Sequence, residues 1–207
     1  MNHSARKTLS LALTAALFGT AAIAVSSNVL AQRDHGGPSS LASNCETWLD
    51  GRPERNIPPH CRELAGQLNQ LRRATSAFHS YDVAVVAGWD TILGGCVESP
   101  MGGMGYHVHN MDQFLNGHLN LLRPEVLLYA PTEDGSMEFV GVEYIIPGNL
   151  WNSGEPPQLL DQPLHFNPNV GPTGIWALHV WTARHNPEGI FADWNPNVSC
   201  EFDPWAE

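Results

Sequence analysis

The chain has 207 residues, of which 21 are acidic and 10 basic, so its formal charge is −11 at pH 7. Such an acidic chain is not expected to bind nucleic acid or an anionic membrane surface. The chain is long enough for one domain with its own core.

The first 31 residues have the pattern of a bacterial secretory signal peptide. Arg6 and Lys7 form the charged start, residues 9–25 form a mostly apolar run, and residues 29–31 form a small-residue cleavage site. Polar residues interrupt the apolar run, which favours a cleaved signal over a retained membrane anchor. We therefore predict a periplasmic or extracellular protein that is not inserted in the membrane after cleavage.

Removal of the signal peptide also changes the charge of the chain. It leaves 8 basic residues (10 − 2), all of them arginine, against 21 acidic ones, which is a formal charge of −13 (8 − 21). The absence of lysine from this part excludes Schiff-base chemistry and a P-loop.

Four cysteines, Cys45, Cys61, Cys96 and Cys200, lie in the exported part. An even number in an oxidising compartment predicts two disulfides. Of the three possible pairings we favour Cys45–Cys61, which closes a proline-rich loop, with Cys96–Cys200, which ties the end of the chain to a glycine-rich stretch. Metal ligation by thiolates is then not expected.

Residues 32–44 are predicted to be a flexible lead-in, and residues 45–207 a single metal-binding domain. A helical region is predicted from residue 62 to residue 88, because leucines recur there at intervals of three or four. Strands are predicted at 106–111, 125–129, 138–146 and 175–181, the second and third of which form a hairpin. The fold class is therefore α+β, with the helical region packed on a mostly antiparallel sheet that is open or closed into a small barrel.

The stretch from residue 102 to 111 organises the candidate site. Gly102, Gly103 and Gly105 allow tight turns or a close approach of another backbone, and a short extended segment with His107 and His109 follows. In a strand this spacing places both imidazoles on one face. The pair therefore predicts half of a metal site, against the alternative of two polar side chains on a solvent-facing strand.

Two further histidines are candidate ligands. His179 lies in an apolar strand, where alternation places it on one face with Ala177 and Trp181. A buried histidine must bind or hydrogen-bond something, so the choice lies between a metal ligand and a satisfied core residue. His165, on a predicted loop rim, is a third or fourth ligand.

Glu143 is a carboxylate in the middle of an apolar strand, and such a charge needs a cation, a partner or a raised pKa. We interpret it as a metal ligand or as a general base beside the metal, with an ion pair to Arg123 or Arg184 as the alternative. Glu125, at the start of its strand, is predicted to be more solvated. Tyr106, near the histidine pair, is a candidate for orienting a substrate, as is Tyr144, although core packing is their more ordinary role.

The residues around the histidines bear on which metal is bound. Met101, Met104 and Met111 offer thioethers, which favour copper, whereas imidazole with carboxylate also suits iron or zinc. The leading hypothesis is a protein that binds one transition-metal ion, with copper favoured. The alternatives are a metal-dependent enzyme that uses Glu143 and Tyr106, and a metal-free module that binds a small molecule between tryptophans, namely Trp176, Trp181 and Trp194.

Several short segments resemble a group of small secreted bacterial proteins to which no activity is attached. They are Met104–His107, Arg123–Tyr129, Val142–Tyr144, Leu178–Trp181 and Asn186–Pro196. This resemblance implies export and a single domain, and it implies no reaction.

The HxH pair is also loosely similar to that of cupins, small β-barrels that hold a metal with an HxH, a later Glu and a later His. In this sequence Gln113 or Phe114 stands where cupins carry the Glu. His179 falls two residues after the position of the last cupin histidine.

Overall fold

The structure is a computed structural model, which describes Cys45, Leu49 and residues 57–205. These residues all belong to one compact unit. The predicted signal peptide and lead-in, residues 1–44, lie outside the described residues. No helix in the described part has both the length and the apolar character needed to cross a membrane.

The predicted helical region is confirmed as a series of short helices. They are α2 (Arg62–Thr75), η3 (Ser76–His79) and α3 (Tyr81–Val86), and the 3₁₀ turn η2 (Pro59–Cys61) precedes the predicted region. Helix α2 buries its leucines, Leu64, Leu68 and Leu71, along one side, which is why their spacing of three or four residues predicted it.

Most of the remaining elements are strands. In chain order they are β1 (Thr91–Ile92), β2 (Val97–Ser99), β3 (Gly102–His109), the short helix α4 (Met111–Phe114), β4 (Val126–Pro131), β5 (Met137–Pro147), η4 (Gly148–Leu150), β6 (Gln158–Leu159), β7 (Gln162–Pro163), β8 (His165–Asn167) and β9 (Ile175–Val180). The main sheet has the order β1-β3-β4-β5-β9-β8, and β2 pairs with β3. All pairings are antiparallel.

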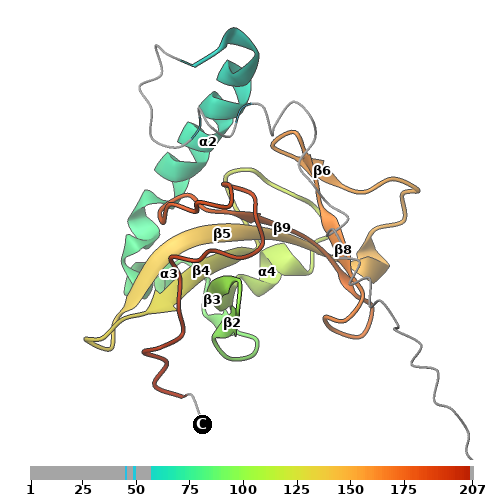
Figure 1. The fold of residues 1–207 in the computed structure, drawn as a ribbon. Helices are drawn as coiled ribbons and strands as arrows, with labels where there is room; N and C mark the ends of the chain where they lie inside the picture. The colour runs from blue at the N-terminus through green and yellow to red at the C-terminus, as the bar shows by residue number, and fades with distance from the viewer. Residues whose placement is uncertain (1–44, 46–48, 50–56, 206–207) are drawn as a thin grey trace, which may run out of the picture. The chain divides into compact units, whose positions relative to one another are not determined.

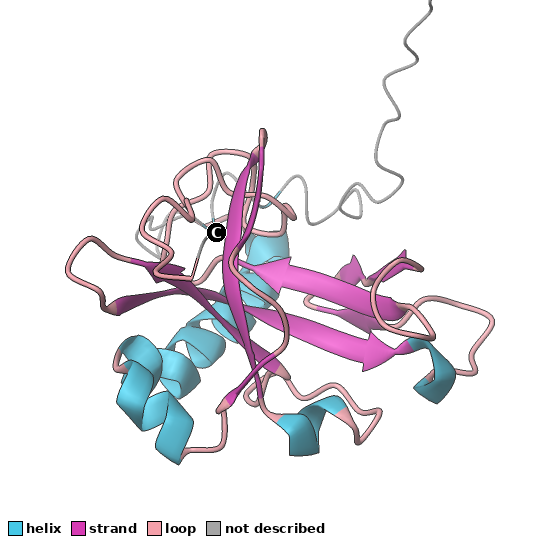
Figure 2. Cartoon of the chain, turned by 90° about the horizontal axis from the view of Figure 1, so that it is seen from below, coloured by secondary structure: helices cyan, strands magenta, loops and turns pink. Residues whose placement is uncertain are grey.

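The α+β class, with a mostly antiparallel sheet, is therefore confirmed, and the sheet is open instead of closed into a barrel (Figures 1 and 2). The predicted hairpin is β4 and β5. Strand β3 begins at Gly102, earlier than predicted, because glycines that read as a turn take part in the strand. The shortest strands were not predicted, since two or three residues carry no usable periodicity.

The two faces of the sheet carry different side chains. The register pairs Glu143 with His179 and Tyr144 with Leu178, and paired residues of antiparallel strands share a face. We call the face with His107, His109, Glu143 and His179 the histidine face, and the face with Tyr129, Tyr144, Leu127 and Val142 the tyrosine face.

Helical residues cover the tyrosine face. The Tyr129 hydroxyl donates to the carbonyl of Phe78, at 2.7 Å. The ring of Tyr81 packs edge-on against that of Tyr129, with 5.1 Å between the ring centroids. The tyrosine rings and the strand residues beside them are fully buried. This side of the sheet is therefore the core of the domain.

The C-terminal segment lies against β9 and β3, as its red trace in Figure 1 shows. Its Asn195 forms an isolated bridge with Gly103. A Cβ atom on Gly102, whose φ is +122°, would stand 2.4 Å from the carbonyl oxygen of Asn195. The glycines therefore admit a second backbone at this place, as predicted. The Cys96–Cys200 disulfide closes the same region, which confirms that pairing.

Candidate metal centre

Three side chains from three strands meet on the histidine face: His107 of β3, Glu143 of β5 and His179 of β9. Glu143 and His179 are directly paired across neighbouring strands. His107 reaches them across β4. One ligand atom from each residue lies within 4.8 Å of the other two. The structure therefore brings together two of the predicted histidine ligands and the predicted carboxylate.

The carboxylate of Glu143 lies between the two imidazoles. Its Oε2 is 3.5 Å from Nε2 of His107, and its Oε1 is 3.6 Å from Nε2 of His179. All three side chains are nearly or fully enclosed, with exposed fractions of 14% for His107, 4% for Glu143 and 5% for His179. These side chains are therefore largely shielded from water.

The gaps between these atoms are too long for good hydrogen bonds. Within the described residues, Glu143 Oε2 and both ring nitrogens of His179 are buried without a hydrogen-bond partner. Two ligands each about 2.1 Å from a tetrahedral ion stand roughly 3.4 Å apart. The distances therefore match a set of donors around one ion better than a set of direct hydrogen bonds.

Burial and mutual charge set the protonation of the cluster. Burial, then the charges of His179 and His109, lowers the pKa of His107 to about 3, so this ring is neutral at pH 7. Burial raises the pKa of Glu143. Burial alone would lower the pKa of His179, but the carboxylates of Glu143 and Asp193 together raise it. A cation at this site would therefore compete with protons for Glu143 and His179.

Asp193 lies on the far side of His179 and was not predicted as a site residue. Its Oδ1 is 3.4 Å from Nδ1 of His179, the nitrogen that faces away from Glu143. The His179 ring lowers the pKa of Asp193, with a smaller contribution from His165. No periodicity marks an aspartate in a loop, and the only signal in the sequence was its place between the Asn-Pro pairs at 186 and 195.

His109 shares the histidine face with His107, as the HxH spacing predicted, but its ring does not join the cluster. Its Nδ1 is 3.0 Å from the carbonyl oxygen of His107, so this nitrogen carries the proton. Burial lowers the pKa of His109, while the carbonyls of His107 and Thr91 raise it. The two rings therefore diverge: His107 reaches toward β5, whereas His109 faces backbone carbonyls, one of them from β1.

His165 lies on β8 opposite Ala177, so it is on the histidine face beside His179. Its ring is outside the group of three ligands. It is half-buried and contributes to the charge felt by Asp193. The structure therefore places His165 next to the cluster and not in it.

The two candidate tyrosines do not reach the cluster. Strand alternation places Tyr106 on the opposite side of β3 from His107. Its hydroxyl donates to Asp203. Tyr144 is on the tyrosine face, where its hydroxyl donates to the carbonyl of Leu121 at 2.6 Å. Both hydroxyls thus have structural partners.

The alternative partners considered for Glu143 are not those that the structure shows. Arg184 pairs with Glu138, and the ion pairs found for Glu143 in the described part are with its two histidines. The prediction that Glu125 is solvated was wrong, since this side chain is fully buried. It precedes β4 and accepts a hydrogen bond from the amide of Ile145, which draws it into the sheet.

The methionines and tryptophans are also spread over different surfaces. Met104 lies at the bulge where β3 pairs with β2, and Met101 is 56% exposed. Along β9, Trp176 falls on the opposite face from Trp181. The ring of Trp181 stacks on that of His179, with 6.2 Å between the ring centroids. The tryptophan pocket considered above is therefore not formed in that way.

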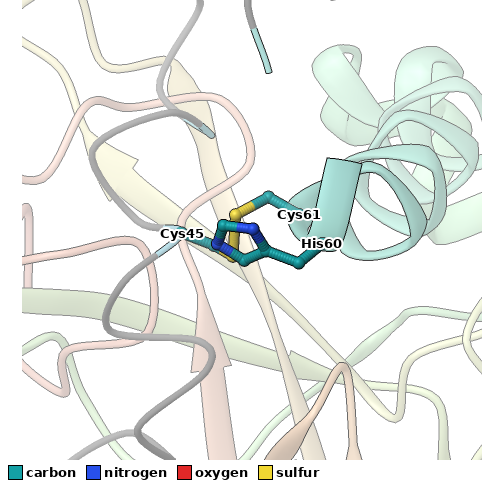
Figure 3. A group of neighbouring side chains, drawn as sticks. All are labelled: Cys45, His60 and Cys61. Atoms are coloured by element: carbon teal, nitrogen blue, oxygen red, sulfur yellow. A yellow bond between two sulfur atoms is a disulfide. The ribbon is translucent and has the colours of Figure 1, made fainter. Parts of the chain in front are cut away.

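A second group with metal-ligand atoms consists of Cys45, His60 and Cys61. The two sulfurs form the predicted disulfide, at an S–S distance of 2.07 Å, and the His60 ring lies beside it (Figure 3). A disulfide offers no thiolate to a metal. This group is consequently a structural crosslink, and the cluster on the histidine face is the candidate site.

Comparisons with protein-family models, with curated proteins and with solved structures found no match to this chain.

Proposed function

We propose that this chain is an exported protein that binds one transition-metal ion through His107, Glu143 and His179. One observation carries the proposal: both oxygens of a buried carboxylate face imidazole nitrogens at 3.5 and 3.6 Å without hydrogen-bonding them. Leaving such groups unpaired in a protein interior is costly. A shared cation offsets that cost for all three residues at once.

The ligand set bears on the identity of the ion. Two imidazoles and one carboxylate suit Zn(II), Fe(II) or Cu(II), whereas Cu(I) favours soft thioether and thiolate ligands. The prediction of copper rested on methionines, whereas the group of three consists of two imidazoles and a carboxylate. The geometry therefore favours a divalent ion, copper(II) included, over copper(I).

Export is supported by two independent features. The sequence of residues 1–31 has the order of a secretory signal, and the described part is closed by two disulfides. Mass spectrometry of the protein recovered from a periplasmic extract tests this, with a chain that begins at Gln32 as the expected result. Recovery of the full-length chain in the cytoplasmic fraction alone would contradict it.

The metal site is tested with His107→Ala and His109→Ala, two variants of the same kind on the same strand and face. Elemental analysis of the purified, untagged proteins should show near-stoichiometric metal in the wild type and in His109→Ala. The His107→Ala variant should lose the metal, because of these two rings it is the one found beside Glu143. If both variants keep the wild-type amount of metal, the ion is bound elsewhere. If the wild type holds no metal even after reconstitution, the proposal fails.

A second candidate function is metal-dependent catalysis, which the number of ligands favours. Catalytic zinc sites have three protein ligands and an open position for water or substrate, and this cluster provides three. Azide added to the Co(II)-loaded protein tests for the open position. A change in the visible spectrum supports a site that can activate a substrate, whereas an unchanged spectrum indicates a closed site for storage or transport.

A further inference from the structure

We infer that Asp193 is a positioning residue of the metal centre, which holds the His179 ring so that Nε2 faces the ion. This inference rests on the proposed function and names a part of the site that the sequence did not suggest. It also gives the C-terminal loop, residues 185–197, a role in metal binding.

The contact is between one carboxylate oxygen and one ring nitrogen. Oδ1 of Asp193 is 3.4 Å from Nδ1 of His179, while Nε2 of the same ring is 3.6 Å from Glu143. The ring therefore has a carboxylate at each end. Its Nδ1 is buried and has no other polar partner among the residues that the structure describes. Asp193 is thus the available acceptor for a proton on this nitrogen.

The loop that carries Asp193 is held on its N-terminal side by Trp181. The Trp181 backbone amide donates to Ile190, at 2.9 Å, and its indole Nε1 donates to the carbonyl of Ala192, at 2.6 Å. The same indole ring stacks on His179, with an angle of 12° between the ring planes. Trp181 therefore fixes both members of the Asp193–His179 pair.

Two asparagines hold the loop from within and from its C-terminal side. Asn186 donates to the carbonyl of Trp194, and Asn195 donates to the carbonyl of His185. Asn195 is fully buried and also bridges to Gly103 of β3. The position of Asp193 is therefore set by a stiff loop before any metal binds, which precise positioning requires.

The chemistry follows from how histidines bind metals. A ligating histidine commonly donates its second ring N–H to a carboxylate, which fixes the tautomer and the ring orientation and makes the other nitrogen a stronger donor. In this site, a proton on Nδ1 leaves the lone pair of Nε2 directed to the side where Glu143 and His107 lie. Asp193 would thereby raise the affinity without touching the ion.

The experiment compares Asp193→Asn with Glu188→Gln. Both variants remove one negative charge from the same loop, but Glu188 is exposed and its side chain has no part in the cluster. Each protein is titrated with Co(II) against a chromophoric chelator, the visible spectrum of the bound ion is recorded, and urea unfolding of the metal-free form is measured. The expected result is an affinity about 10- to 100-fold lower for Asp193→Asn, with a shifted Co(II) band, and wild-type behaviour for Glu188→Gln.

The outcomes separate this inference from the proposed function. If the wild type binds the metal and Asp193→Asn binds it with the same affinity, the inference is overturned and the metal site stands. Weaker binding with an unshifted Co(II) band and a lower unfolding midpoint would also overturn it, because the role would then be structural. If the wild type binds no metal, the proposed function fails and the inference fails with it.

Discussion

The protein buries two carboxylates, Glu125 and Glu143, in very different surroundings. Glu143 is 3% exposed and lies between two imidazole rings. Glu125 is fully buried, accepts one hydrogen bond from the amide of Ile145, and has its other oxygen unpartnered within the described part. No ion pair in that part joins Glu125 to a basic side chain.

Burial acts in the same direction on both groups. It raises the pKa of Glu143, and it raises the pKa of Glu125 to about 8 even though backbone amides oppose the change. The difference lies in the neighbours, since only Glu143 lies beside imidazole nitrogens. A buried carboxylate thus becomes a candidate ligand through the donors beside it, and without them it becomes a protonated core residue.

The largest effect is expected at Glu125, in the pH dependence of stability. Its folded pKa of about 8 lies above its ordinary value of 4.5, so its contribution to stability is fully present below pH 4.5 and is lost as the pH rises through 8. The loss approaches about 5 kcal/mol at about 1.4 kcal/mol per pKa unit. Glu125→Gln keeps an acceptor for the Ile145 amide and should lack this loss.

Urea unfolding of the metal-free proteins at pH 5, 7 and 9 measures this difference. The variant should match the wild type at pH 5 and exceed it in unfolding free energy at pH 9. Glu133→Gln, in the exposed turn between β4 and β5, controls for removal of an acidic residue next to the same strand. Parallel curves for wild type and Glu125→Gln would show that Glu125 is ionised in the folded protein.

The second effect concerns metal affinity and separates the two carboxylates directly. Glu143→Gln should weaken binding by at least about 100-fold, more than the roughly 10- to 100-fold typical of residues behind a ligand, because it removes a charged ligand atom. Glu125→Gln should leave the affinity unchanged. Competition titrations with Zn(II) measure both. Equal losses in the two variants would mean that Glu143 acts through the fold and not as a ligand.

Much of this fold could be read from the sequence because its periodic segments are long. The leucines of α2 and the apolar runs of β4, β5 and β9 marked their elements, and the two disulfides followed from cysteines placed near a proline-rich loop and a glycine stretch. Whether the sheet is open or closed into a barrel could not be predicted. Whether β1 and β8 pair with each other depends on the twist and length of strands that sequence periodicity does not report.

The site was predictable to the extent that strand alternation controls it. Alternation placed His107 and His109 on one face, and it placed His179 in the interior. Alternation does not say which way each ring turns, so it could not separate His107 from His109. It also gives no information about a loop, and Asp193 was missed for that reason.

The smallest effect is expected at Tyr144, which is next to Glu143 in sequence but on the other face of β5. Tyr144→Phe removes the hydrogen bond to the Leu121 carbonyl and should lower the unfolding free energy by about 1 kcal/mol. Tyr129→Phe, which loses the matching bond to Phe78, should cost a similar amount. Neither should change Zn(II) affinity, because strand alternation directs both side chains away from the histidine face. Weaker Zn(II) binding in Tyr144→Phe alone would show that the hydrogen bond to Leu121 helps to position Glu143 on the other face of β5.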